Sequence, residues 1–513
     1  MHVLGDIPRL NAKRYPQKKA LIMDDRYVTF SQLNEQVNQL AHRLLSLGLG
    51  LGDRVGILAY NCIEYVMIYY AVAKCGGIVV PLNFRYKKDE LTYAINTSDP
   101  KILFFGPDFV SLVENARAGF VSSSHLVAIS GEPLESGLTL TNLMKGQPSS
   151  ELSLVVNPSS PCTILYTSGT TGFPKGVLMS HHAWLNTYTG EIVEGDAHHD
   201  DIALVSMPLF HGGGMHVLLQ PTLVKGGTAV IMGKGFDPDK FLSVVNRYYI
   251  TLTLLVPTQL AMLVNYPGSV KYKISTLKKI WYGSSPISPA VLEASMDLFK
   301  AGFYQWYGQT ETGMISVLRP EDHRERSQCT GREIFNADLR VVDENGQDTP
   351  LGEVGEIIST QNHSGMIGYH KLEEATQETV RNGWIYTGDL AKVDGDGYFT
   401  IVGRSKDMII SGAENIYPKE IEDVLMDHPG VCEVAVIGIP DEVWGESVCA
   451  VVVPKEGREL DEAVIIGFCA NRLSGYKKPK KVVFMNELPK NPAGKVTKNI
   501  LREPFWAGRK KKI

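Results

Sequence analysis

The sequence predicts an α/β protein with a large N-terminal domain of mixed, mostly parallel sheets and covering helices, followed by a small α+β C-terminal domain. Three observations lead to this prediction. Short apolar runs of buried-strand length alternate with longer amphipathic segments. Glycine supplies 49 of the 513 residues and collects in the turns between these runs. A chain of this length can also build more than one hydrophobic core.

The N-terminal region shows how the elements are assigned. Apolar residues at helical spacing over 29–49 predict an amphipathic helix with Ser31 as its N-cap. A second helix is expected over 64–74, and Gly76 suits the C′ position after it. Strands separated by helices favour parallel sheets. The strands are expected at residues 55–59, 78–81, 101–105, 202–206, 228–232 and 251–256.

The pattern changes near residue 400. A strand over 398–402 precedes a polar segment at 403–407, after which strands and helices alternate closely. We therefore expect a large domain over residues 1–402, a hinge at 403–407 and a small domain over 408–513. An ordinary surface turn inside one domain is the alternative for 403–407. In the small domain, strands are expected at 408–410, 433–438 and 448–454, and helices at 419–427 and 461–473.

The charges are distributed unevenly along the chain. The formal net charge is −5, which argues against a nucleic-acid partner. Residues 471–513, however, contain thirteen Lys and Arg and two Glu. A basic end on an acidic body therefore needs an explanation, and the segment from Arg509 to Lys512 has no assigned role.

Cysteine use and hydropathy indicate the compartment. The seven cysteines form no CxxC pair, which argues against a disulfide framework and a zinc site and favours buried, reduced thiols. No apolar run approaches the 18 residues of a membrane span, and the first residues do not resemble a signal peptide. We expect a cytoplasmic protein without a transmembrane segment.

The strongest local signal is the segment Tyr166-Thr167-Ser168-Gly169-Thr170-Thr171-Gly172-Phe173-Pro174-Lys175-Gly176. Glycines let backbone N–H groups turn toward an anion, hydroxyls add donors and lysine adds positive charge. The composition therefore indicates phosphate binding. It is not a Walker A loop, because Gly176 follows Lys175 where Ser or Thr would be needed.

This loop resembles the signature of the adenylate-forming superfamily, which includes acyl-CoA synthetases, amino-acid adenylation domains and beetle luciferases. Further motifs of the family recur in order, so that the resemblance covers nearly the whole chain. They are Tyr307-Gly308-Gln309-Thr310-Glu311-Thr312, Tyr386-Thr387-Gly388-Asp389-Leu390, Gly403-Arg404-Ser405-Lys406-Asp407 and Pro489-Lys490-Asn491-Pro492-Ala493-Gly494-Lys495.

The resemblance implies an ATP site with Mg²⁺. Tyr307 would lie against the adenine, Asp389 would accept the ribose hydroxyls, and Arg404 would reach the ribose or a phosphate. Glu311 would bind Mg²⁺, and Thr310 would contact the α-phosphate as the reaction proceeds. Lys495 would be the catalytic lysine that stabilises charge on the α-phosphate and the leaving pyrophosphate. The remaining ATP residues would be Thr167, Ser168, Gly169, Thr170, Thr171, Lys175, Gly283, Ser284, Ser285 and Gly308.

The choice of acid follows from the segment Phe210-His211-Gly212-Gly213-Gly214-Met215, which resembles the acid pocket of fatty-acid and aryl-acid CoA ligases. Amino-acid adenylation domains place Asp where His211 stands, so an amino acid is disfavoured. His211 would line and gate the pocket, although a satisfied core histidine is the alternative. A medium or long aliphatic acid, or a cyclic or aryl acid, suits such a lining. The other predicted wall residues are Phe210, Met215, Val256, Tyr282 and Met314.

For the second half-reaction the resemblance implies that the small domain rotates about Lys406 and admits coenzyme A. The predicted CoA residues are Gly412, Trp444, Tyr476 and Lys477. The function expected is therefore an AMP-forming acyl-CoA ligase, and a homodimer is a further expectation. Two alternatives stay within the family, an acyl-AMP ligase that loads a carrier protein and a luciferase-like oxygenase. A nucleotide-binding sensor without turnover is the third alternative.

Overall fold

The chain forms two compact units that are discontinuous in sequence. The first comprises Met1–Leu339 and Ser359–Ile385, and the second comprises Arg340–Ile358 and Tyr386–Ile513. The predicted hinge at 403–407 falls within the second unit; because a hinge concerns motion, it stays a prediction. The computed structural model describes residues 1–121, 125–131, 133–134, 137–167, 174–362, 364–412, 414–490 and 496–507.

One sheet of the first unit has the strand order β15-β14-β13-β12-β11-β9-β10-β1-β2. Its central neighbours run parallel, whereas β2 at one edge and β14 and β15 at the other pair antiparallel. The strands are β1 (Lys19–Met23), β2 (Arg26–Thr29), β9 (Ile202–Val205), β10 (Thr228–Ile231), β11 (Leu252–Leu255), β12 (Lys279–Gly283), β13 (Gly302–Gln309), β14 (Gly313–Leu318) and β15 (Arg332–Glu333).

The second sheet of this unit has the order β18-β8-β7-β4-β3-β5-β6. It is parallel from β7 to β6 and antiparallel where β8 pairs with β7 and β18. The predicted mostly parallel α/β architecture is therefore confirmed. The strands are β3 (Arg54–Leu58), β4 (Ile78–Pro81), β5 (Pro100–Phe105), β6 (His125–Ala128), β7 (Pro161–Thr167), β8 (Lys175–Ser180) and β18 (Gly368–Tyr369).

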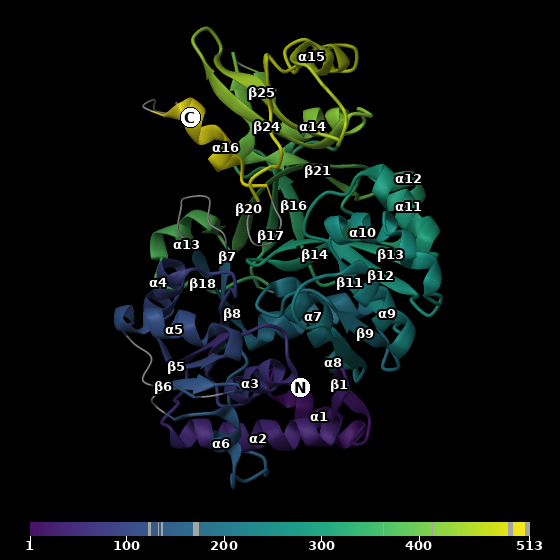
Figure 1. Cartoon of the computed structure of the whole chain (residues 1–513). Helices are drawn as coiled ribbons and strands as arrows, with labels where there is room; N and C mark the ends of the chain where they lie inside the picture. Colours follow the sequence, from purple (N-terminus) through teal and green to yellow (C-terminus); the bar gives the residue numbers. More distant parts are fainter. Residues whose placement is uncertain are drawn as a thin grey trace. The chain divides into compact units, whose positions relative to one another are not determined.

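Helices cover both sheets and bury the apolar core (Figure 1). Trp281, Tyr188 and Phe104 are among the largest fully buried side chains. The helices of this unit are α1 (Asp6–Arg14), α2 (Phe30–Ser46), α3 (Ile63–Lys74), α4 (Lys88–Ser98), α5 (Val110–Ala116), α6 (Leu140–Met144), α7 (His181–Glu194), α8 (Gln220–Lys225), α9 (Pro238–Tyr248), α10 (Pro257–Val264), α11 (Pro289–Phe299), α12 (His323–Arg326) and α13 (Glu373–Thr379).

The strands of the second unit belong to two sheets. One has the order β16-β17-β20-β19, with β21 paired to β20; its strand β19 and the ends of β16, β17 and β20 are residues of the first unit. The other has the order β23-β22-β25-β24, with β26 paired to β25. The strands are β16 (Leu339–Val342), β17 (Gly355–Thr360), β19 (Val380–Arg381), β20 (Trp384–Val393), β21 (Phe399–Arg404), β22 (Ile409–Ser411), β23 (Glu414–Ile416), β24 (Val431–Asp441), β25 (Gly445–Pro454) and β26 (Lys481–Phe484), and the helices are α14 (Pro418–Met426), α15 (Glu462–Ala470) and α16 (Lys498–Trp506).

The helix predicted over 29–49 is α2, but its N-cap differs from the prediction. Thr29, not Ser31, accepts a hydrogen bond from the Gln32 backbone, and the Gln32 side chain accepts one from the Thr29 backbone. This reciprocal capping box satisfies two N–H groups, which Ser31 inside the helix could not do. Gly76 takes the C′ position after α3 with φ +71°, as predicted.

The predicted absence of transmembrane segments agrees with the described part of the chain, where no helix has the length and hydrophobicity that crossing a membrane requires. The cysteines are free thiols, and Cys75, Cys162, Cys449 and Cys469 are buried. The expectation of burial is wrong for Cys432, which is exposed.

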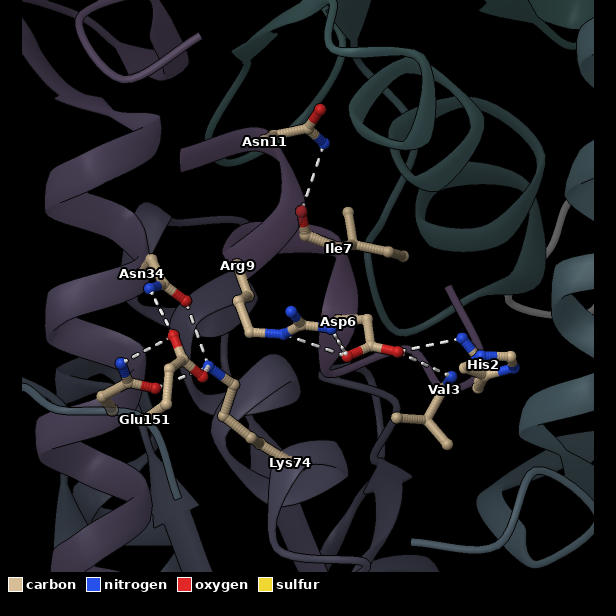
Figure 2. Close-up of polar contacts among 10 residues, drawn as sticks. His2, Val3, Asp6, Ile7, Arg9, Asn11, Asn34, Lys74 and Glu151 are labelled. Carbon is tan, nitrogen blue, oxygen red and sulfur yellow. Dashed lines mark hydrogen bonds and ion pairs between the residues drawn. The ribbon is translucent and has the colours of Figure 1, made fainter. Parts of the chain in front are cut away.

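A nearly buried lysine joins helices α2 and α3 to the segment before β7. Lys74 Nζ lies 2.8 Å from a carboxylate oxygen of Glu151 and 3.0 Å from Asn34 Oδ1, as Figure 2 shows. The Lys74 side chain is 8% exposed, whereas that of Glu151 is 41% exposed. Burial is the largest single influence on Glu151, but hydrogen bonds from Lys74, Asn34 and Asn38 together hold its pKa below the ordinary value. The carboxylate therefore stabilises the fold at neutral pH, and this contribution is lost as the pH falls into the carboxyl range.

We predict that Glu151→Gln lowers the free energy of unfolding by about 1–2 kcal/mol at pH 7, because it leaves the Lys74 ammonium with neutral partners. The figure is below that of a fully buried pair because water reaches Glu151. The matched control is Glu64→Gln in the ion pair of Arg26 and Glu64, whose arginine side chain is 62% exposed. Urea denaturation of both variants checks the prediction, and equal midpoints would contradict it.

Candidate active site

The predicted phosphate loop connects two antiparallel strands. β7 ends at Thr167 and β8 begins at Lys175, and these two residues pair directly. Both ends of the loop are therefore held together by two paired strands of the second sheet. Four residues predicted to bind phosphate, Ser168, Gly169, Thr170 and Thr171, lie outside the described residues.

One tyrosine connects this loop to the predicted magnesium ligand. The Lys175 ammonium lies 4.9 Å from the centre of the Tyr369 ring, and the Tyr369 hydroxyl donates to Glu311 Oε1 at 3.0 Å. Burial, and then the Glu311 charge, raise the pKa of Tyr369, so that the hydroxyl remains a proton donor at neutral pH. The structure thus brings Lys175 and Glu311, from two separate motifs, to the same tyrosine.

Sequence reasoning missed Tyr369, because it belongs to none of the motifs. The segment that carries it bridges the two sheets of the first unit. Met366 N donates to Glu311 O, Ile367 N to Leu178 O and His370 N to Gly176 O, each at 2.8 Å. The signal that could have found it is Tyr369 itself, an aromatic residue that favours strands, but Gly368 beside it disfavours them, so the signal is too weak to use alone.

The predicted adenine residues lie on neighbouring strands. β12 and β13 are parallel, and Gly283 pairs with Trp306, the residue before Tyr307. A Cβ atom on Gly283 would lie 2.3 Å from Trp306 O, so this close approach requires glycine. Ser284 follows with φ +71°, a conformation that non-glycine residues rarely adopt. The turn that contains Ser285 therefore leaves the strand sharply beside Tyr307.

The motif 307–312 crosses the tight connection between β13 and β14. A Cβ on Gly308 would lie 2.1 Å from Gly313 O, which explains this glycine by backbone packing. Gln309 N donates to Thr312 Oγ1 at 3.1 Å and thereby orders the turn. Thr310 and Glu311 stand at the tip of this turn, between two strands that hold them in place.

The predicted ribose residues form an ion pair in the second unit. Arg404 Nε lies 2.8 Å from Asp389 Oδ1, and the two residues are also partners across β20 and β21. Gly388 N donates to a Glu356 carboxylate oxygen at 2.7 Å, which fixes strand β20 just before Asp389. Burial, and then the charge of Arg404, lower the pKa of the predicted hinge residue Lys406.

The three glycines beside His211 differ in what requires them. A Cβ on Gly214 would lie 2.4 Å from Pro208 O, so the fold excludes any side chain there. A Cβ on Gly213 would make ordinary contacts at 3.6 Å or more, and one on Gly212 would meet nothing within 4 Å. Packing therefore does not explain Gly212 and Gly213, which leave room beside His211.

A buried histidine that sequence reasoning missed supports this segment. His216 belongs to the π-helical segment η3 (Gly213–Leu219) and stacks on Trp184 with ring centres 3.7 Å apart. Its Nδ1 is 2.6 Å from the Tyr188 hydroxyl, and its Nε2 is 3.3 Å from the Tyr69 hydroxyl. Burial, and then His211, lower the pKa of His216 well below its ordinary value, so it is neutral. The signal was a second histidine five residues after His211.

The other predicted wall residues of the acyl pocket belong to the first unit, and most contact its core. Met215 is 1% exposed and accepts a hydrogen bond at Sδ from Gln220. Tyr282 is fully buried, and its hydroxyl donates to Gln305 Oε1 at 3.0 Å. Phe210 packs edge-on against Phe84. Val256 and Met314 are partly buried against the core. Their part in binding an acid stays a prediction.

The residues predicted to meet CoA lie in the second unit, and two of them are exposed aromatics. Trp444 is 52% and Tyr476 is 47% exposed. Gly412 N donates to Trp444 O at 2.8 Å, which joins two turns. Lys477 pairs with Glu420 at 2.7 Å; burial lowers the pKa of Lys477, but the Glu420 carboxylate more than offsets this and raises it.

No group of three His, Cys, Asp or Glu side chains is arranged to hold a metal in the ranges that the structure describes. A carboxylate such as Glu311 fits Mg²⁺ that arrives with nucleotide phosphates, because such ions take few protein ligands. Lys495 and the segment from Arg509 to Lys512 lie outside the described residues.

Comparisons with known proteins match most of the chain to one family of enzymes. Residues 9–370 match the family model of AMP-binding enzymes, and residues 420–495 match the model of their C-terminal domain. A feruloyl-CoA synthase of Amycolatopsis is 37% identical over 98% of this chain and 99% of its own. A fatty acid–acyl-carrier-protein ligase of Streptomyces coeruleorubidus is 35% identical over 100% and 98%. The crystal structure of an anthranilate CoA ligase with anthranoyl-AMP has a TM-score of 0.90 at 27% identity, covering 98% of this chain and 97% of the other.

We predict that Tyr369→Phe weakens the binding of ATP with Mg²⁺ about fivefold. The change removes the hydroxyl that orients Glu311 but keeps the ring beside Lys175; one hydrogen bond to a half-buried charged group contributes about 1 kcal/mol. Titration calorimetry measures the dissociation constant. Tyr248→Phe, which removes a hydroxyl bonded to the Asp24 carbonyl far along the chain from the motifs, is the control. Equal affinities for the two variants would contradict the assignment.

Proposed function

We propose that this chain, which belongs to the family of AMP-binding, adenylate-forming enzymes, is an ATP-dependent acyl-CoA ligase. It would convert a carboxylic acid and ATP to acyl-AMP and pyrophosphate, and then acyl-AMP and CoA to acyl-CoA and AMP. The family membership rests on the match over residues 9–370 and on relatives of full length. It also agrees with the α/β fold and the order of the motifs.

The observation that carries the proposal is the contact series Lys175, Tyr369 and Glu311. A lysine for phosphate oxygens contacts the ring of one tyrosine, and a carboxylate for Mg²⁺ accepts from the hydroxyl of the same tyrosine. A triphosphate with its metal needs both charges within a few ångströms of each other. A nucleotide-binding sensor without turnover could use the same two charges. The completeness of the set Thr310, Glu311, Asp389, Arg404 and Lys495 argues against that alternative.

In the first half-reaction a carboxylate oxygen of the acid attacks the α-phosphorus of ATP. The new oxygen–phosphorus bond forms as the bond to pyrophosphate breaks, so that negative charge grows on the α-phosphate and the leaving group. Thr310 would donate to the α-phosphate, Lys175 would hold the pyrophosphate, and Lys495 would bridge the two. Mg²⁺ held by Glu311 would neutralise the phosphates. Asp389 and Arg404 would hold the ribose.

In the second half-reaction the CoA sulfur attacks the acyl carbonyl carbon. The carbon–sulfur bond forms, the bond to the AMP oxygen breaks, and the thiol proton passes to solvent. The small domain would rotate about Lys406 to admit CoA. Trp444 would then pack on the CoA adenine, beside Tyr476 and the turn at Gly412. Lys477 would attract the CoA phosphates. Because it stays paired with Glu420, this attraction would be weaker than that of an unpaired lysine.

The substrate we propose is a medium or long aliphatic acid, or a cyclic or aryl acid. Gly212 and Gly213 support this proposal, because packing would allow a side chain at either position and its absence leaves space beside His211. The apolar residues around His211 support it as well. His211 would line and gate the pocket. Loading of a carrier protein is the second candidate, favoured by the likeness to a ligase with that activity. A luciferase-like oxygenase stays a further alternative within the family.

Two further expectations belong to this proposal. A cytoplasmic location follows from the need for ATP and CoA. A homodimer stays a prediction from the resemblance to related enzymes.

We predict that Lys495→Ala lowers the rate of ATP–pyrophosphate exchange by at least about 10²-fold, as expected when a charged group that acts in the transition state is removed. The same variant should convert supplied acyl-AMP and CoA to acyl-CoA at nearly the original rate. Lys498→Ala, three residues later, is the control. Full exchange activity in the Lys495 variant would refute the assigned role.

A further inference from the structure

One ion pair lies on each side of the predicted hinge residue Lys406 along the chain. Before it, Arg404 is paired with Asp389 across the neighbouring strands β21 and β20. After it, Arg502 Nη2 lies 3.0 Å from Asp407 Oδ1. Ser405 and Lys406 are the two residues between the paired positions, within the short turn η6 (Ser405–Asp407).

The later pair is well shielded from water. The side chains of Arg502 and Asp407 are 15% and 19% exposed. The same guanidinium nitrogen lies 3.5 Å from the backbone oxygen of Asp407. Attraction between charges is stronger away from bulk water. Arg502 therefore contacts both the side chain and the backbone of Asp407, the last residue of the turn.

Arg502 is itself held firmly by the helix α16. Its neighbour Leu501 is buried in the core beside β24 and β25. Trp506 Nε1 donates to Gly438 O of β24 at 3.1 Å. Lys498 Nζ lies 2.6 Å from Glu422 Oε1 of α14. These contacts fix α16 to the small α+β module, and Lys495 precedes the helix by three residues in the chain.

We infer that Arg502 is a positioning residue for the hinge. By holding Asp407 against α16, it makes Asp407 part of the small domain and confines the rotation to Ser405 and Lys406. The inference rests on the proposed function, because a hinge has a task only if two half-reactions need two orientations of that domain. Arg502 acts through Asp407 and contacts no substrate.

A two-residue pivot permits few orientations of the small domain. Each half-reaction needs one of them, the first to bring Lys495 to the phosphates and the second to bring in CoA. Release of Asp407 lengthens the free segment and adds unproductive orientations, which lowers the population of both productive ones. Lys175, Glu311 and the pocket around His211, which would bind the triphosphate and the acid before the reaction, belong to the first unit. Turnover should therefore fall while affinity for ATP and acid stays.

The test compares Arg502→Gln with Lys498→Gln in the full-length enzyme. Both variants remove one cation from α16, and the two ion pairs are equally shielded, with 17% and 20% exposure for Lys498 and Glu422. We expect Arg502→Gln to lower kcat about tenfold with KM for ATP and acid within about twofold, a split typical of a lost conformational step. Lys498→Gln should keep kcat, and Arg502→Lys should restore most of it.

A purely structural role predicts a different result. Both glutamine variants would then melt at lower temperature and show the same kcat per folded molecule, and this would overturn the inference. If Arg502→Gln does not fold, Asp407→Asn keeps the size of the side chain and carries the same expectation. Wild-type enzyme without acyl-CoA formation would refute the proposed function instead, whereas active wild type with equal variants refutes only the role of Arg502.

Discussion

The site depends on one extended segment, from Met366 to His370, whose backbone is hydrogen-bonded to both sheets of the first unit. It pairs with β8 on one side and with the turn at Glu311 on the other. Because of this, Tyr369 meets Lys175 and Glu311 together, although the three residues are far apart in sequence. Without this segment, no side chain would contact both the lysine proposed for the phosphates and the carboxylate proposed for the metal in this way.

The contacts of the basic C-terminal segment, residues 471–513, change how its charge is interpreted. Among the described residues, five of its lysines and arginines are paired with acidic residues of the second unit: Lys477 with Glu420, Lys480 with Asp441, Lys490 with Glu433, Lys498 with Glu422 and Arg502 with Asp407. Much of the positive charge that the sequence places there therefore holds the small domain together. In the proposed mechanism, Lys495 and Lys477 are the cations of this region that act on substrates.

Much of the fold follows from sequence patterns alone, because strand and helix periodicity predicted the mostly parallel sheets. The motifs predicted which residues would surround a nucleotide, and those roles stay predictions. The predicted N-cap of α2 was wrong because serine is at least as common an N-cap as threonine. The reciprocal bond between Thr29 and Gln32, which spacing does not show, decides for Thr29. Tyr369 and His216 were missed because their importance comes from tertiary contacts, which spacing along the chain does not record. The reasons for Gly283 and Gly308 were hidden in the same way, since a close backbone approach is a property of neighbouring strands.

The central claim is that the chain activates an acid with ATP and transfers the acyl group to CoA. The most direct measurement is product analysis by mass spectrometry, with ATP, Mg²⁺, CoA and a panel of aliphatic, cyclic and aryl acids. The account predicts acyl-CoA, AMP and pyrophosphate in equal amounts for at least one class of acid, and no acyl-CoA when ATP is omitted. Formation of ADP and phosphate, or acyl-AMP that accumulates unchanged in the presence of CoA, would contradict it.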